Sequence, residues 1–208
     1  MPIKVYSQEQ KESIKLQLLD TALHMYSKHG IRNVTLMDVL KSVGISKPFF
    51  YTFYESVQEF VICVLEYQWT KFPKFFEEID SRTDLSWEDQ IYMYLKGVTY
   101  YSDTGFLIMT QEEEVWIRKH IDDNRYQGFM NDQVKYFEDL LIKWGVPDGK
   151  CNPKVLANMI LTMILIHSSS KHSLPFFYID DLDETAKAHA KSIIEYLRAL
   201  KSDEKSIL

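Results

Sequence analysis

The sequence has few of the residues that interrupt helices, with 7 glycines and 6 prolines among 208 residues. Strand-like alternation of apolar and polar residues does not persist anywhere, which argues against a β-sheet protein and predicts an all-α fold. Two cysteines are too few for a disulfide framework. No signal peptide is recognisable at the N-terminus, so we expect a cytoplasmic location. The longest apolar run, residues 155–166, is too short to cross a bilayer, and we expect no membrane partner.

Signatures of catalysis and of bound cofactors are also missing from the sequence. It contains no Gly-rich phosphate loop, nucleophile elbow, Cys-x-x-Cys pair or Glu-x-x-His pair. We therefore expect no enzymatic activity, no catalytic residues and no cofactor. The run Glu112–Glu114 with His120 resembles a metal site, but successive carboxylates point in different directions on a helix. A solvated face is the better interpretation of this run, and no metal site is predicted.

Residues 35–54 contain two short amphipathic segments around a Gly-Ile-Ser corner. Thr35 and Asp38 have the spacing of a capping box, and Gly44 follows the last periodic residue of the first segment. Ser46 is suited to cap the second segment. This pattern is typical of a DNA-binding helix-turn-helix. The residues expected to contact DNA are Thr35, Ser46, Lys47, Pro48, Phe49, Tyr51, Thr52 and Tyr54.

Charge is divided unevenly along the chain, whose formal net charge is -6. Residues 1–54 contain seven Lys or Arg and four Asp or Glu, a net charge of +3. The remaining residues contain 17 basic and 26 acidic side chains, a net charge of -9. This asymmetry places an attractive field for phosphate at the N-terminal end of the chain.

A specific order of motifs runs from about residue 10 to residue 65. It consists of KHG at residues 28–30, TLMDVLKSV, GIS, the aromatic run FFYTFY and a capped helix that opens ESVQEF. The segment resembles the N-terminal domain of the TetR family of bacterial transcriptional regulators. Pro48 and Phe49 stand where the family commonly has Gly-Thr, and Val57 stands where a lysine usually opens the fourth helix. The first departure leaves the base preference open, and the second removes an expected phosphate contact.

The resemblance implies a division of the chain into two functional parts. Residues 1–54 would form the DNA-binding domain, and residues 55–208 an effector-binding and dimerisation domain. The implied function is that of a ligand-responsive regulator, typically a repressor, that binds double-stranded DNA as a homodimer. Two heads related by a two-fold axis would read a roughly palindromic operator.

Two helices near the C-terminus are candidates for the dimer seam, as the resemblance implies. The predicted helix over residues 153–170 is apolar nearly all round, so it must be buried on both sides. The predicted helix over residues 183–201 has one apolar stripe suited to the same seam. The residues expected at the dimer interface are Ile160, Ile164, Ala190, Ile193, Ile194 and Leu197.

The middle of the chain is rich in aromatic residues and methionines, within predicted helices that include residues 87–101, 106–120 and 123–144. Such residues most often fill a core, but tyrosine hydroxyls inside a bundle need partners, which suits an amphipathic pocket. The resemblance implies such a pocket, for an apolar or aromatic small molecule. The residues expected to line it are Phe76, Tyr92, Tyr100, Trp116, Tyr136, Met163 and His167.

A different class of function stays open at this point. The chain could keep a TetR-like head for contact with proteins, or bind small molecules without controlling a promoter. Salt dependence separates the two classes, because binding to duplex DNA weakens steeply with added salt.

Overall fold

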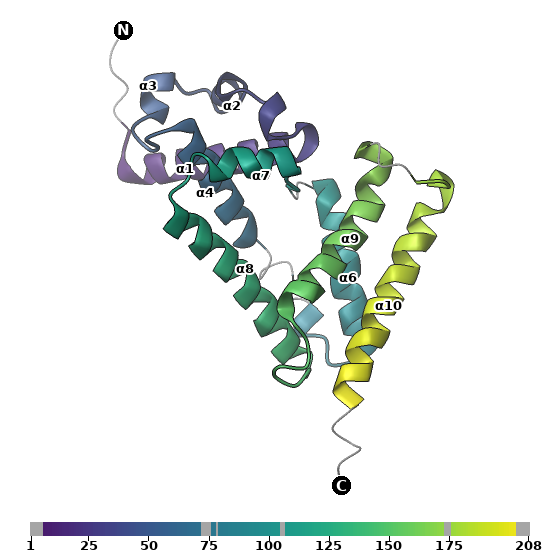
Figure 1. Ribbon diagram of the computed structural model, residues 1–208. Coiled ribbons are helices and arrows are strands. Elements are labelled where there is room, and N and C mark those ends of the chain that lie inside the picture. Colours follow the sequence, from purple (N-terminus) through teal and green to yellow (C-terminus); the bar gives the residue numbers. More distant parts are fainter. Residues whose placement is uncertain (1–5, 72–75, 78, 105–106, 173–175, 203–208) are drawn as a thin grey trace. The chain divides into compact units, whose positions relative to one another are not determined.

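The protein is described by a computed structural model, whose ordered elements are helices within the described ranges (Figure 1). This confirms the all-α prediction. The described residues are 6–71, 76–77, 79–104, 107–172 and 176–202, with the backbone alone for 100–104, 168–172 and 202. None of the described helices is long and apolar enough to span a membrane.

The chain is divided into two compact units, and each is described here by itself. The first comprises Met1–Phe72 and Thr104–Tyr126, and the second comprises Pro73–Asp103 and Gln127–Leu208. The first unit thus includes two stretches that follow residue 54, and the functional boundary expected after that residue stays a prediction.

The first unit contains a three-helix head and the helices that pack on it. They are α1 (Gln8–His29), η1 (Ile31–Asn33), α2 (Leu36–Val43), α3 (Lys47–Phe50), α4 (Val57–Trp69), α7 (Gln111–Arg118) and the start of α8 (Asp123–Lys143). Helix α1 packs against both α2 and α4. The core between them includes Leu18, Val39, Phe50 and Phe60, each fully buried.

Helix α4 begins as the sequence predicted, since Ser56 Oγ accepts a hydrogen bond from the Glu59 amide at 3.0 Å. Arg125 at the start of α8 holds this helix through two bonds to Glu66, of 3.1 and 3.0 Å. The bend expected at Pro73 lies outside the described residues.

Helix α7 is shorter than the predicted helix over residues 106–120. It begins at Gln111 because Thr110 forms a capping box with Glu113, a spacing that the sequence analysis overlooked. Leu107 before it has no helical conformation and is held by the buried side chain of Gln68, whose Nε2 donates to the Leu107 carbonyl at 3.2 Å.

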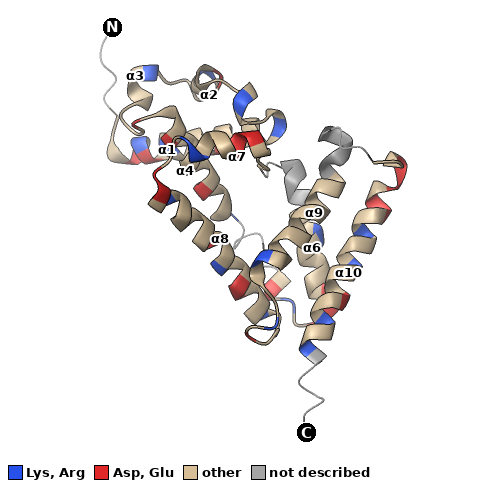
Figure 2. Cartoon of the chain, in the orientation of Figure 1, with Lys and Arg blue, Asp and Glu red and all other residues tan. Residues whose placement is uncertain are grey.

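The second unit contains the remaining helices, in which α9 and α10 pack along each other (Figure 1). They are α6 (Trp87–Thr104), the larger part of α8, α9 (Pro153–His172), η2 (Ile179–Asp181) and α10 (Leu182–Ser202). Most of α9 carries no charged side chain, whereas charged residues recur along α10 (Figure 2).

The six residues expected at the dimer interface lie on α9 and α10. All of them are at most 6% exposed within the single chain. Their side chains are therefore covered by the chain itself, and the expected dimer interface stays a prediction. The periodicity identified the apolar stripe correctly. The exposed large apolar residues of α9 are Val155 and Leu161, at 42% and 38%.

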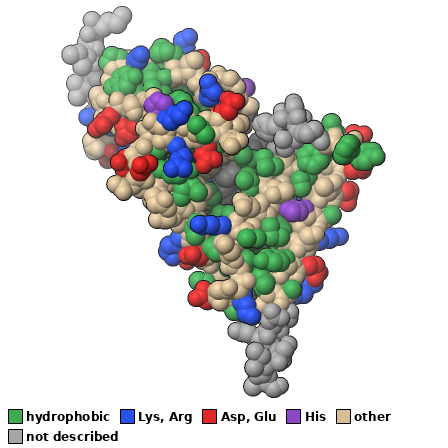
Figure 3. All heavy atoms as spheres, in the orientation of Figure 1, with side chains coloured by type: hydrophobic (Ala, Val, Ile, Leu, Met, Phe, Trp, Pro, Cys, Tyr) green, Lys and Arg blue, Asp and Glu red, His purple; other side chains and the backbone are tan. Residues whose placement is uncertain are grey.

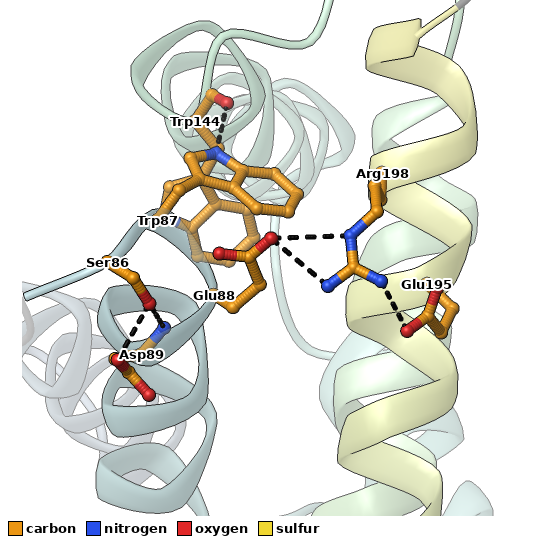
Figure 4. Close-up of polar contacts among 7 residues, drawn as sticks. All are labelled: Ser86, Trp87, Glu88, Asp89, Trp144, Glu195 and Arg198. Carbon is orange, nitrogen blue, oxygen red and sulfur yellow. Dashed lines mark hydrogen bonds and ion pairs between the residues drawn. The ribbon is translucent and has the colours of Figure 1, made fainter.

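Polar contacts join the start of α6 to the end of α8 and to α10 (Figure 4). The Trp87 indole donates to the Trp144 carbonyl at 2.7 Å, which satisfies an acceptor near the end of α8. Arg198 of α10 donates to Glu88 through Nε and Nη2, at 3.3 and 3.1 Å, and to Glu195 at 2.5 Å. Of these contacts, the indole bond joins the start of α6 to the chain just after α8. The Trp87 side chain that makes it is half-buried.

Replacing Trp87 with Phe should lower the free energy of unfolding by about 1–2 kcal/mol, because the Trp144 carbonyl loses its donor while an aromatic ring remains. Urea denaturation followed by circular dichroism measures the change. Ile142→Ala is the control, since Ile142 is 67% exposed and its truncation should have little effect. Equal stability of Trp87→Phe and the wild type would show that the indole bond contributes nothing.

Candidate nucleic-acid interface

The capping box predicted at the start of α2 is present. Thr35 Oγ1 accepts from the Asp38 amide at 3.3 Å, while Asp38 Oδ2 accepts from the Thr35 amide at 2.9 Å and from its hydroxyl at 2.6 Å. These hydrogen bonds from Thr35 hold the pKa of Asp38 below its usual range. Helix α2 ends at Gly44, which has φ of 75° and ψ of 33°. This left-handed conformation suits glycine and lets the chain turn directly into α3.

Helix α3 is a single turn, which begins after Ser46 and ends at Phe50. Ser46 Oγ accepts from the Phe49 amide at 3.4 Å, as expected for its N-cap. Beyond Phe50 the chain continues as a turn, in which the Thr52 hydroxyl donates to the Phe49 carbonyl at 2.7 Å. Five of the predicted DNA-contacting residues are exposed on this segment: Ser46, Lys47, Pro48, Tyr51 and Thr52.

Two of the residues predicted to contact DNA are placed differently by the structure. Tyr54 is 2% exposed and packs against Phe50 and Phe60 at ring-centroid distances of 5.2 and 4.8 Å, so it belongs to the core of the head. Burial raises the pKa of its hydroxyl. Phe49 is half-buried, because its ring stacks on Tyr6 at 4.5 Å and meets the edge of Phe53 at 5.0 Å. The stack leaves Phe49 less surface for DNA than the sequence predicted.

Positive charge on this surface is sparse. Lys47 is the single cation of α3 (Figure 2), and Lys41 near the end of α2 is also exposed. Lys28 and His29 lie in the last turn of α1, and both are exposed. The exposed surface of residues 46–52 therefore combines one cation with a proline ring, a phenol and two hydroxyls, which suits contact with phosphates and base edges.

A buried carboxylate that the sequence analysis missed joins α7 to the head. Glu113 is 4% exposed, and its Oε1 accepts from the Ile31 amide at 2.7 Å. Its Oε2 accepts from the Thr110 amide and hydroxyl at 2.9 and 3.1 Å. Gly30 has φ of 80°, and a Cβ there would lie 3.2 Å from Glu113 Oε1. The absence of a side chain at Gly30 therefore permits the close approach of the carboxylate.

The expectation that Glu112–Glu114 form a solvated face is wrong for Glu113. The Thr-x-x-Glu spacing at Thr110 would have indicated that this carboxylate turns back toward its own helix end. Its second partner, Ile31, lies 82 residues earlier, and no local pattern points to it.

The predicted effector-pocket residues are distributed over both units. Trp116 belongs to the first unit. In the second unit, Phe76 stacks on Tyr94 at 4.0 Å, and the hydroxyls of Tyr94 and Tyr136 form a hydrogen bond. Burial raises the pKa of Tyr94 well above its usual value and that of Tyr136 to about 12, so both phenols stay neutral.

The other predicted pocket residues lie on α6 and α9. Met163 is 2% exposed, Tyr92 and His167 are half-buried, and His167 Nδ1 lies 3.4 Å from Asp183 Oδ1. The side chain of Tyr100 lies outside the described residues. The tyrosine that connects two of the predicted residues, Tyr94, was missing from the predicted set.

Comparison with known proteins gives structural neighbours but no sequence relatives. No family model matches the chain, and no curated protein matches it. A TetR-like transcriptional regulator from Rhodococcus sp. RHA1 is 16% identical over 96% of this chain and 100% of its own, with a TM-score of 0.48. A TetR/AcrR family regulator from Thermobifida fusca YX-ER1 is 15% identical over 88% and 97%, with a TM-score of 0.43. The reduced form of NemR from E. coli is 12% identical over 90% and 96%, with a TM-score of 0.47.

Replacing Glu113 with Gln should lower the free energy of unfolding by about 1–3 kcal/mol. The amide retains one acceptor oxygen, but its NH2 group faces a donor either at Ile31 or at Thr110. Chemical denaturation measures the loss. Glu112→Gln is the matched control, because Glu112 is exposed and its pair with Arg32 should contribute less than about 1 kcal/mol. Identical losses in the two variants would contradict a special role for the buried carboxylate.

Proposed function

We propose that this chain is a DNA-binding transcriptional regulator that uses α2, the turn at Gly44 and α3 as a helix-turn-helix. The observation that supports the proposal is that some residues of this segment are buried in the core of the head while others are exposed. Thr35 and Asp38 lock the start of α2, Phe50 lies in the core of the head, and the side chains between Ser46 and Thr52 that do not serve the core are exposed. An apolar contact surface for another protein would not place Lys47, a proline and hydroxyls together at a helix start.

The charge distribution supports the same proposal. The +3 charge of residues 1–54 attracts phosphate, whereas the -9 charge of the remainder disfavours non-specific contact of that part with DNA. An overall charge of -6 is thus compatible with a DNA-binding head.

We further propose a homodimer that binds a roughly palindromic operator and acts as a repressor. The exposed side of α9 is the surface we assign to the second copy, in place of the buried seam residues. It presents Val155, Asn158, Leu161 and Thr162, at helical spacing along one side. Hydrophobic side chains gather on the visible face of the second unit, over α9 (Figure 3). A face with two exposed aliphatic residues and small polar ones suits contact with an identical helix.

The effector is proposed to be an apolar or aromatic small molecule bound in the second unit. We propose that five of the predicted residues line this pocket: Phe76, Tyr92, Tyr136, Met163 and His167. The neutral phenols of Tyr94 and Tyr136 would supply the few polar groups that orient a ligand in an apolar site.

Replacing Lys47 with Ala should weaken binding to DNA and flatten the dependence of log affinity on log salt by about one charge. The DNA is the set of genomic fragments that the purified protein retains, identified by sequencing, and fluorescence anisotropy at several salt concentrations measures affinity. Lys135→Ala is the control, since it removes the same charge from an exposed position on α8.

A wild-type protein that retains no DNA, or whose binding is insensitive to salt, would favour the alternative of a protein-interaction or small-molecule-binding protein. Equal salt slopes for Lys47→Ala and Lys135→Ala would contradict the assignment of α3 to the groove.

Replacing Leu161 with Glu should convert the dimer to monomer without unfolding it, because the side chain is already 38% exposed in the single chain. In a dimer the new carboxylate would be buried without a partner. Sedimentation velocity measures the assembly. Ile142→Glu places the same charge at an exposed apolar position of α8 and should leave the dimer intact. A dimeric Leu161→Glu variant would move the interface away from α9.

A further inference from the structure

A surface depression of about 460 Å³ lies within the first unit. This volume falls in the range of small-molecule sites, roughly 300–1,000 Å³. One lining residue comes from η1 and the others from α7 and the position after it. The lining residues are Arg32, Gln111, Glu112, Val115, Trp116 and Lys119.

The residues from α7 share one side of that helix. Glu112, Val115, Trp116 and Lys119 are spaced at i, i+3, i+4 and i+7, which brings them into one row. Two of them are apolar: Val115 is 47% exposed, and Trp116 is half-buried with one side of its ring near His120, at 5.2 Å. The depression therefore offers an apolar surface on a helix that is otherwise strongly charged.

Two basic side chains and one carboxylate also line this depression. Arg32 Nη1 pairs with Glu112 Oε2 at 3.1 Å, but the two side chains are 59% and 81% exposed. A pair that exposed contributes about 0–1 kcal/mol, so a ligand anion can replace Glu112 at little cost. Lys119 has no ion-pair partner among the described residues. The depression thus holds two cations, one of them weakly paired, that one anionic group could bind.

The walls of the depression are fixed before any ligand binds. The Glu113 carboxylate accepts a hydrogen bond from the Ile31 amide. Each of these residues is next in sequence to a lining residue, Glu112 or Arg32. This bond sets η1 against α7, so a ligand that spans the two segments finds them already in place. Preorganisation of this kind reduces the entropy lost on binding.

We propose that this depression binds a small anionic aromatic compound. Its ring lies on Val115 and Trp116, and its carboxylate or sulfonate pairs with Arg32 and Lys119. The residues of this site differ from those of the effector pocket proposed in the second unit. The proposed function does not include a ligand here, and this ligand would contact η1, the segment before α2.

The test uses the full chain and 1-naphthoate as the probe, with titration calorimetry as the measurement. We expect saturable binding with one site per chain. Arg32→Ala and Lys119→Ala should each weaken it about tenfold, as the loss of one charge-assisted hydrogen bond predicts. Trp116→Ala should weaken it as well, and Lys135→Ala should leave it unchanged. Because Arg32 and Lys119 are exposed, their truncation should leave the far-UV circular dichroism spectrum unaltered.

A neutral probe with the same ring, 1-naphthalenemethanol, separates recognition of charge from general apolar binding, and it should bind at least about tenfold more weakly. Equal affinity for the two probes would overturn the proposal. It would also be overturned by the absence of naphthoate binding at millimolar concentration, or by unchanged affinity in both Arg32→Ala and Lys119→Ala. None of these measurements involves DNA, so failure here is distinguishable from failure of the proposed function.

Discussion

The hydrogen bond between the Glu113 carboxylate and the Ile31 amide constrains much of the first unit. A buried carboxylate is tolerated only when donors surround it, and here Thr110 and Ile31 supply them. A side chain at Gly30 would crowd the carboxylate, and its φ of 80° is one that other residues rarely adopt. The end of α1, the start of η1 and the start of α7 are therefore fixed by one interaction.

This constraint makes a segment from the middle of the sequence part of the first unit. Gln68 of α4 binds the Leu107 backbone, and Glu113 binds the Ile31 backbone, so residues 107–113 are attached to the head at two points. Thr35, the N-cap of α2, follows Ile31 by four residues. If the head binds DNA as proposed, and if its affinity depends on the position of α7, a ligand that prefers one position of α7 would change that affinity, and DNA would change the affinity for the ligand by the same factor.

Features that depend on local sequence were predictable, and those that depend on distant partners were not. The capping box at Thr35 and the glycine turn at Gly44 involve residues within one turn of each other, and both were predicted correctly. The burial of Glu113 depends on an amide 82 residues away, so local periodicity placed it in solvent. Likewise, the stripe that contains Ile193 was recognised as apolar, but periodicity cannot tell whether α9 of the same chain or a second subunit covers it.

The shortness of α3 gives a reason for the dimer surface that we propose on α9. With Phe49 stacked on Tyr6 and Tyr54 in the core, α3 offers Lys47 as its one cation for phosphate. Electrostatic affinity for DNA grows with the number of phosphates neutralised, so under the proposed function a single head of this composition would bind weakly. Joining two heads makes the second contact intramolecular and raises the overall affinity without any new residue at the groove. An apolar surface that includes Leu161 would therefore supply, through dimerisation, the affinity that α3 alone lacks.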